Sequence, residues 1–153
     1  MKLMDNIVKE AIIIDLASKD KIGVISELTE ALVKAKKVSS REKIIRILLD
    51  REELGSTGIG SGVAIPHGKT DEIDKVIIAF GSSKAGIEFA SLDGAPVHLV
   101  FLLLAPADSA GEHLQALAKI SRMVKDKRCR PLLREASCVE EIVKIITEED
   151  KKQ

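Results

Sequence analysis

The feature that most constrains the fold is the apolar run from Val97 to Leu104, whose only titratable side chain is His98. A strand that is apolar on both faces must be covered on both faces, so the run predicts the central strand of a buried sheet. A transmembrane helix needs about 20 consecutive apolar residues. This run is far shorter, and we therefore expect no membrane insertion.

Strand and helix patterns alternate along the rest of the chain. Apolar runs at residues 11–16 and 76–80 predict two further strands, and residues 63–65 predict a short one. Apolar residues recur at helical spacing in four places, which are residues 22–32, 44–49, 114–124 and 139–146. Three capping boxes are expected at helix starts, pairing Ser39 with Glu42, Ser109 with Glu112 and Ser137 with Glu140.

This order of elements predicts a three-layer α/β/α fold, in which helices flank a sheet of about five strands. The sheet should be mixed, with parallel and antiparallel pairs, because the predicted strands between residues 63 and 104 follow one another closely. A chain of 153 residues has about the length of one domain. Residues 1–153 are therefore expected to form a single domain.

The composition argues against two classes of partner. Lys and Arg total 24, as do Asp and Glu, so no net field attracts nucleic acid or an anionic membrane. With no Trp or Tyr and only Phe80, Phe89 and Phe101, the chain has no aromatic platform on which bases stack. Charges within residues 1–16 interrupt the apolar core that a signal peptide needs, which predicts a cytoplasmic protein.

Residues 55–70, GSTGIGSGVAIPHGKT, hold five of the ten glycines and one of the three histidines. The segment Gly58–Gly62 is expected to form a loop. Two nucleotide-binding patterns fail here. The dinucleotide fingerprint GxGxxG needs a glycine where Val63 stands, and the phosphate-loop pattern has one residue too many between Gly62 and Gly68.

The histidine in this segment has an unusually fixed backbone. Pro66 locks its own φ and pushes Ile65 into extended backbone, and Gly68 is expected to leave space beside the ring. Amides of the Gly58–Gly62 loop are expected to form a concavity for an anion. A neutral imidazole beside such a site suits covalent phosphoryl transfer, in which a ring nitrogen attacks phosphorus. The plainer alternative is that His67 only ends a strand.

Two stretches carry a family resemblance: REELGSTGIG at residues 51–60 and VAIPHG at residues 63–68. They resemble the phosphorylation-site signature of the fructose/mannitol-type IIA proteins of the bacterial phosphoenolpyruvate-dependent sugar phosphotransferase system (PTS). The wording STGIG and IPHGK is most similar to the nitrogen-regulatory IIA branch. The resemblance covers nearly the whole chain, and it implies a phosphocarrier (EIIA) that is phosphorylated on His67.

The resemblance also implies two supporting residues. The family has a second active-site histidine at the start of the helix after the central strand, and His113 matches that place. With Ser109 as the N-cap, His113 lies in the first helical turn, where the positive helix end lowers the pKa of an imidazole. Arg51 matches an arginine that neutralises phosphoryl oxygens. Without the resemblance, Arg51 would be taken as a solvated side chain.

The partners are likewise implied by the resemblance. A histidine phosphocarrier, HPr or its nitrogen-branch homologue NPr, would donate the phosphoryl group, and a IIB domain or regulatory target proteins would follow. The sequence contains no attached IIB domain or membrane segment, which favours a regulatory role over a sugar route. The alternatives are a freestanding IIA subunit of a fructose- or mannitol-type transporter, and a binding regulator that is never phosphorylated.

No cofactor and no metal ion are expected. The histidines show no HxxxH or HExxH spacing, and His98, which matches no motif position, is expected to be structural. Cys129 and Cys138 form no CxxC pair and are expected to be packing residues. A metal hydrolase is the least favoured alternative.

Overall fold

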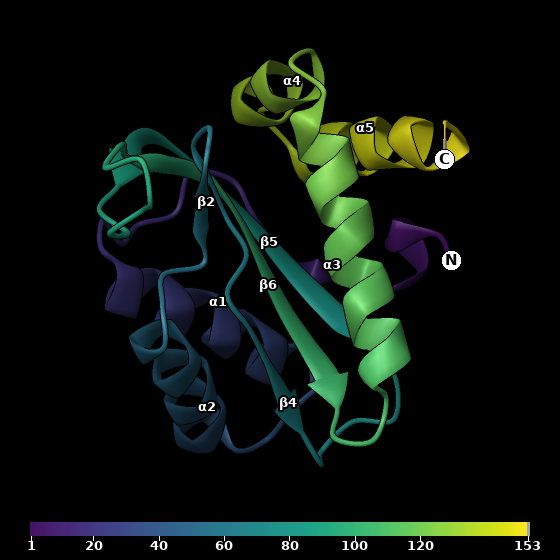
Figure 1. The fold of residues 1–153 in the computed structure, drawn as a ribbon. Helices are drawn as coiled ribbons and strands as arrows, with labels where there is room; N and C mark the ends of the chain where they lie inside the picture. The colour runs from purple at the N-terminus through teal and green to yellow at the C-terminus, as the bar shows by residue number, and fades with distance from the viewer. Residues whose placement is uncertain (153) are drawn as a thin grey trace.

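The computed structural model describes residues 1–152 and contains a mixed six-stranded sheet between two layers of helices (Figure 1). In chain order the elements are η1 (Leu3–Asp5), β1 (Ile7–Ile13), α1 (Lys21–Lys34), α2 (Arg41–Glu53), β2 (Gly58–Gly60), β3 (Val63–Ala64), β4 (His67–Thr70), β5 (Ile77–Ile87), β6 (Val97–Pro106), α3 (Ala110–Lys125), α4 (Cys129–Glu135) and α5 (Val139–Lys151). Helices α1 and α2 cover one face of the sheet, and α3, α4 and α5 cover the other. The predicted three-layer α/β/α fold is confirmed, with six strands in place of about five. Within residues 1–152, no helix has the length and apolar character needed to cross a membrane.

Strand β6 lies inside the sheet and contains the apolar run from Val97 to Leu104. It pairs with antiparallel β5 on one side and with parallel β3 and β4 on the other. Its residues alternate between two cores: Leu99 and Phe101 pack with α3, α4 and α5, whereas Val100 and Leu102 pack with α1 and α2. The strand is apolar throughout because it supplies side chains to both cores.

Strands β3 and β4 lie end to end along the same side of β6, with Ile65 and Pro66 between them. Proline has no N–H to contribute to a ladder, so the strand is interrupted at this point. The Pro66 carbonyl still accepts a hydrogen bond from the Leu103 amide at 2.9 Å. His67 then pairs with Leu103, so it begins the new strand at a fixed position along β6.

Gly68, the second residue of β4, lies against α2. A Cβ atom added to it would lie 2.6 Å from Cγ2 of Ile47 and 3.7 Å from Cδ2 of Leu48. Carbon atoms in normal contact lie about 3.5–4.0 Å apart. Glycine at this position is therefore needed for the close approach of α2 to β4.

The capping box predicted for α2 is wrong. Oε1 of Glu72, from the loop after β4, accepts hydrogen bonds from the amides of Ser39 and Ser40 at 2.8 and 3.2 Å. The Ser39 hydroxyl also donates to Glu72, at 3.0 Å. The predicted partner Glu42 is exposed. A carboxylate from a distant segment therefore accepts the hydrogen bonds at the start of α2 that a local carboxylate was predicted to accept. These bonds connect the start of α2 to the loop that follows β4.

The other two capping boxes are also wrong in their partners. Ser109 is the N-cap of α3, but its hydroxyl donates to the Pro106 carbonyl at 3.2 Å, and Glu112 is exposed. Before α5, the Ser137 hydroxyl donates to Glu141 at 3.0 Å, whereas the sequence predicts Glu140 as its partner. In both places the serine hydroxyl donates a hydrogen bond to another group, whereas in a capping box it accepts one from a helix amide.

Several boundaries also differ from those predicted. Strand β1 ends before Asp15, whose φ of 58° lies in the left-handed region and breaks the extended run predicted at residues 11–16. Strand β5 continues well beyond residue 80. The segment Gly58–Gly62, predicted to be a loop, contains β2, which pairs with β3. Helix α4 was not predicted, because it is short and has no clear amphipathic repeat.

Candidate functional site

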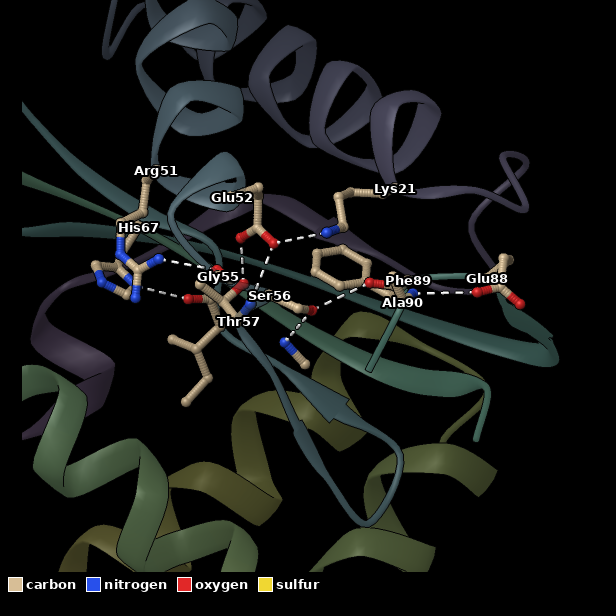
Figure 2. Close-up of polar contacts among 12 residues, drawn as sticks. Lys21, Arg51, Glu52, Gly55, Ser56, Thr57, His67, Glu88, Phe89 and Ala90 are labelled. Carbon is tan, nitrogen blue, oxygen red and sulfur yellow. Dashed lines mark hydrogen bonds and ion pairs between the residues drawn. The ribbon is translucent and has the colours of Figure 1, made fainter. Parts of the chain in front are cut away.

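His67 is held by the backbone just before it. Its Nδ1 lies 2.7 Å from the carbonyl oxygen of Ile65 (Figure 2). A carbonyl oxygen only accepts hydrogen bonds, so Nδ1 must carry the proton and donate it. Nε2 is then the ring nitrogen with a free lone pair. The break between β3 and β4 therefore fixes both the orientation and the tautomer of this ring.

The ring of His113 contacts the ring of His67. The ring centroids are 5.3 Å apart and the ring planes meet at 74°. Strand β6 explains the contact, since β4 pairs with its last residues and α3 begins shortly after it and packs on it. His113 is 9% exposed, and its buried Nε2 has no hydrogen-bond partner among the described residues.

Arg51 lies in the last turn of α2, next to the same pair of rings. Its Nη1 donates a hydrogen bond to the Gly55 carbonyl at 2.9 Å, which holds the half-buried guanidinium at the end of the helix (Figure 2). The positive charge lies close enough to lower the pKa of His67. The structure thus brings together the three residues that the sequence predicts as site residues.

A hollow of about 550 Å³ marks the place where these residues meet. It is lined by Ile47, Asp50, Arg51, Leu54, His67, Gly68, Lys69 and His113. Leu54 is 85% exposed and places an apolar side chain at the surface beside the hollow. A larger cavity of about 750 Å³, between β1 and α1, is lined by no histidine. Because the smaller hollow is lined by two histidines and an arginine, it is the candidate active site.

The pKa of each ring is lowered, which favours the uncharged form of both imidazoles. The pKa of His67 is lowered, chiefly by burial and further by the charge of Arg51, against raising effects of the Ile65 carbonyl and Glu52. The pKa of His113 is lowered by burial first, then by His67 and Lys69. The sequence predicts a lowered pKa for His113 from the helix dipole, whereas burial is the main cause here. A neutral pair suits one nucleophilic nitrogen and one hydrogen-bond donor.

Lys69 is a further residue of the site, and the sequence alone does not mark it as one. Lys69 lines the hollow, two residues after His67 in β4. Side chains two apart in a strand point to the same face, so this position is available only once the segment is known to be a strand. The sequence HGKT has no strand-forming pattern of its own, and its pairing with β6 makes it one.

Glu52 is also not marked by the sequence, because it lies in a charged helix end that looks solvated. In the structure Glu52 is 7% exposed. Its Oε1 accepts a hydrogen bond from the Thr57 amide at 3.1 Å and lies 3.1 Å from Nζ of Lys21 (Figure 2). No periodic signal in the sequence distinguishes this buried carboxylate from its exposed neighbour Glu53.

The anion concavity predicted for the Gly58–Gly62 loop does not lie beside His67. None of these five residues lines the hollow. Residues 58–60 instead pair with β3, and the amide of Ser61 donates to Oδ2 of Asp93 at 3.3 Å. The glycines therefore build the hairpin that leads to His67, and their amides are not arranged around its ring.

The third histidine is separate from the other two. His98 lies near the start of β6, and its half-buried ring bonds to the Ser83 carbonyl through Nδ1 at 2.8 Å. Within residues 1–152, no three His, Cys, Asp or Glu residues are grouped so as to hold a metal ion. Cys129 is a free buried thiol whose pKa is raised to about 12, mainly by burial, and Cys138 is also free. The raised pKa and the burial of Cys129 make its thiol a poor nucleophile.

Comparison with known proteins bears on this geometry. A family model described as "Phosphoenolpyruvate-dependent sugar phosphotransferase system, EIIA 2" matches residues 6–149. The chain is 37% identical over 148 residues to a nitrogen regulatory protein of Bradyrhizobium diazoefficiens, covering 95% of each protein. It is 40% identical over 151 residues to the fructose-specific EIIABC component of Bacillus subtilis. That match takes in 99% of this chain but only 24% of the longer protein.

The fold has a close counterpart among solved structures. The crystal structure of nitrogen regulatory protein IIA-Ntr from Neisseria meningitidis superposes with a TM-score of 0.87 at 33% identity. The superposition covers 94% of this chain and 98% of the other. The order of layers and strands around the two histidines is therefore that of an experimentally determined relative.

Proposed function

We propose that this chain, which belongs to the EIIA 2 family of the phosphoenolpyruvate-dependent sugar phosphotransferase system, is a phosphocarrier that accepts a phosphoryl group on Nε2 of His67. Membership confirms the family resemblance of the sequence, including its similarity to nitrogen regulatory proteins. One observation carries the proposal, the hydrogen bond from Nδ1 of His67 to the Ile65 carbonyl. That bond leaves Nε2 as the nitrogen able to attack phosphorus.

The proposed step is an in-line transfer between two histidines. The Nε2 lone pair of His67 attacks the phosphorus of a phosphohistidine on the donor protein. The new N–P bond forms as the donor's N–P bond breaks, and the donor nitrogen keeps the electron pair of the broken bond. Nδ1 of His67 keeps its proton, so the phosphorylated ring is positively charged and the Ile65 carbonyl faces that charge. Catalysis of such a step depends on positioning and charge neutralisation.

His113 and Arg51 support this transfer in the proposal. A phosphoryl oxygen on His67 would give the buried Nε2 of His113 the hydrogen-bond partner that it lacks among residues 1–152. The guanidinium of Arg51 neutralises negative charge on the phosphoryl oxygens, and the ammonium of Lys69 adds to that effect. Each of these three groups lines the hollow beside His67.

The donor in this proposal is a histidine phosphocarrier of the HPr or NPr type, and residues 1–153 act as one cytoplasmic domain. We propose a regulatory role, since the nitrogen regulatory protein of B. diazoefficiens matches along nearly its whole length. The 40% identity to part of a fructose-specific EIIABC component supports a second candidate, a IIA subunit that passes the group to a IIB domain. Both roles use the same reaction at His67.

Phosphorylation in a defined mixture tests the proposal. Incubation with phosphoenolpyruvate, the first enzyme of the system and HPr or NPr should add one acid-labile phosphoryl group to the protein. His67→Ala should abolish the uptake, and His98→Gln, which alters the remote histidine, should retain it. Subsequent transfer to a fructose- or mannitol-type IIB domain would favour the transport role. Absence of uptake by the wild-type protein would contradict the proposal and leave a binding regulator.

A further inference from the structure

We infer that Glu52 is a positioning residue, which holds the segment whose Ile65 carbonyl sets the tautomer of His67. The inference rests on the proposed phosphorylation of His67. Glu52 does not touch the His67 ring, and it acts through Thr57 and Ile65. Figure 2 shows the contacts of Glu52 with Lys21 and Thr57, and the nearby ring of His67.

The first step is the convergence of donors on the Glu52 carboxylate. Oε1 receives the Thr57 amide at 3.1 Å and faces the Lys21 ammonium at 3.1 Å, while Oε2 receives the Thr57 hydroxyl. The Glu52 side chain is 3% exposed, so water hardly competes with these bonds. Both polar groups that Thr57 offers on this side are therefore bound by one buried carboxylate.

The second step carries this restraint to the strand break. The Thr57 carbonyl accepts a hydrogen bond from the Ile65 amide at 3.0 Å. Thr57 is thus held at its amide by Glu52 and binds Ile65 through its carbonyl. Ile65 is the residue between β3 and Pro66, where pairing with β6 is interrupted. The hydrogen bond from the Ile65 amide to the Thr57 carbonyl is therefore a main restraint on the peptide groups of Ile65.

The third step is the ring itself. The Ile65 carbonyl is the acceptor for Nδ1–H of His67, at 2.7 Å. A shift of this carbonyl would weaken that bond and allow the proton to move to Nε2, which removes the nucleophilic lone pair. Glu52 also lies close enough for its charge to raise the pKa of His67, against the effect of Arg51. The carboxylate thus supports the ring both through its contacts and through its charge.

A purely structural role for Glu52 makes a different prediction. Its pairing with Lys21 joins α1 to α2, and loss of that pair alone would lower the stability of the fold without changing the His67 tautomer. The tautomer is therefore the readout that separates the two roles. It is measured from the imidazole ¹⁵N chemical shifts, which differ between protonated and unprotonated ring nitrogens.

Three substitutions form the experiment. Glu52→Met fills the space without an acceptor, Glu52→Gln keeps an acceptor for the Thr57 amide and a donor for its hydroxyl, and Glu53→Ala removes a charge from the exposed neighbour. We expect Glu52→Met to increase the Nε2–H tautomer and to slow phosphoryl uptake about fivefold, the effect of losing one ordinary hydrogen bond. Glu52→Gln should restore most of the uptake, and Glu53→Ala should match the wild type.

The outcomes separate this inference from the proposed function. A wild-type tautomer in folded Glu52→Met would overturn the inference, and so would a changed tautomer with an unchanged rate of uptake. If Glu52→Met does not fold, Thr57→Val, which removes only the hydroxyl bond, must still shift the tautomer in the same direction. Failure of the wild-type protein to accept a phosphoryl group contradicts the proposed function, whereas the ¹⁵N measurement still decides whether Glu52 holds the ring.

Discussion

Substitution of Gly68 by alanine should damage phosphoryl uptake by displacing α2. The added Cβ would lie 2.6 Å from Cγ2 of Ile47, about 1 Å closer than carbon atoms normally approach. Ile47 is β-branched and sits in a helix, where one χ1 rotamer is strongly preferred, so its methyl group cannot rotate away easily. The helix must therefore shift. Arg51 lies one turn further along the same face of α2 and should move with it.

The expected size follows from two opposing effects. Overpacking of this kind costs about 1–3 kcal/mol, and replacing glycine by alanine regains roughly 0.4–1 kcal/mol from the unfolded chain. The net loss of about 1–2 kcal/mol should lower Tm by about 2–8 °C in a domain of this length. A displacement of about 1 Å at Arg51 should slow phosphoryl uptake by about ten- to a hundredfold.

A double-mutant cycle tests this reasoning through the atom that causes the clash. Ile47→Ala removes Cγ2, so Gly68→Ala combined with Ile47→Ala should take up phosphoryl groups faster than Gly68→Ala alone. Ile47→Val keeps a methyl group at Cγ2 and should not rescue. The rates are measured by quenching the reaction with phosphorylated HPr or NPr at successive times and determining the phosphorylated fraction by mass spectrometry. Equal rescue by alanine and valine, or a wild-type rate in Gly68→Ala, would refute the packing argument.

Three further predictions concern charge and pH. Arg51→Ala should slow uptake about a hundredfold, as loss of one charge-stabilising donor does, and should raise the pKa of His67 in an NMR titration; a wild-type rate would remove Arg51 from the site. The folded-state pKa values of His67 and His113 lie below 6.5. Below about pH 6.5 the unfolded chain therefore binds more protons than the folded protein does, and low pH favours unfolding. The contribution of the two neutral rings to the free energy of unfolding should be fully present above about pH 6.5 and should be lost as the pH drops through the folded-state pKa values. Urea unfolding at several pH values measures this dependence, which should be weaker in His67→Gln than in the wild type. Glu72→Ala should cost about 1 kcal/mol by removing the cap of α2, whereas Glu42→Ala should not; equal losses in thermal unfolding would contradict the observed cap.

The central strand was predictable because its composition reports burial directly. Val97 to Leu104 is apolar on both faces, and only a strand between two helical layers needs that pattern. Strand β4 was not predictable in the same way. Its residues His67–Thr70 are polar or small, and they are extended because β6 offers them a partner. Local sequence carries no record of such pairing.

The residues of the candidate site also differ in how far the sequence predicts them. His67 is marked by its own neighbours, since Pro66 constrains the backbone directly before it and a glycine-rich segment surrounds it. His113 and Arg51 entered through the family resemblance, and the fold then brings them to the same hollow. Glu52 and Glu72 owe their roles to contacts with residues that lie in other segments. A single sequence gives no sign of which acidic residues will find such partners.

The shared dependence of both histidines on β6 limits where the chain tolerates insertions and deletions. His67 takes its place by pairing with Leu103, and His113 follows from the turn that leaves the strand at Pro106. One residue gained or lost between Pro106 and His113 would rotate the second ring by about 100° around its helix axis. Length variation among relatives should therefore avoid this short connection and concentrate in the exposed loop at residues 90–95.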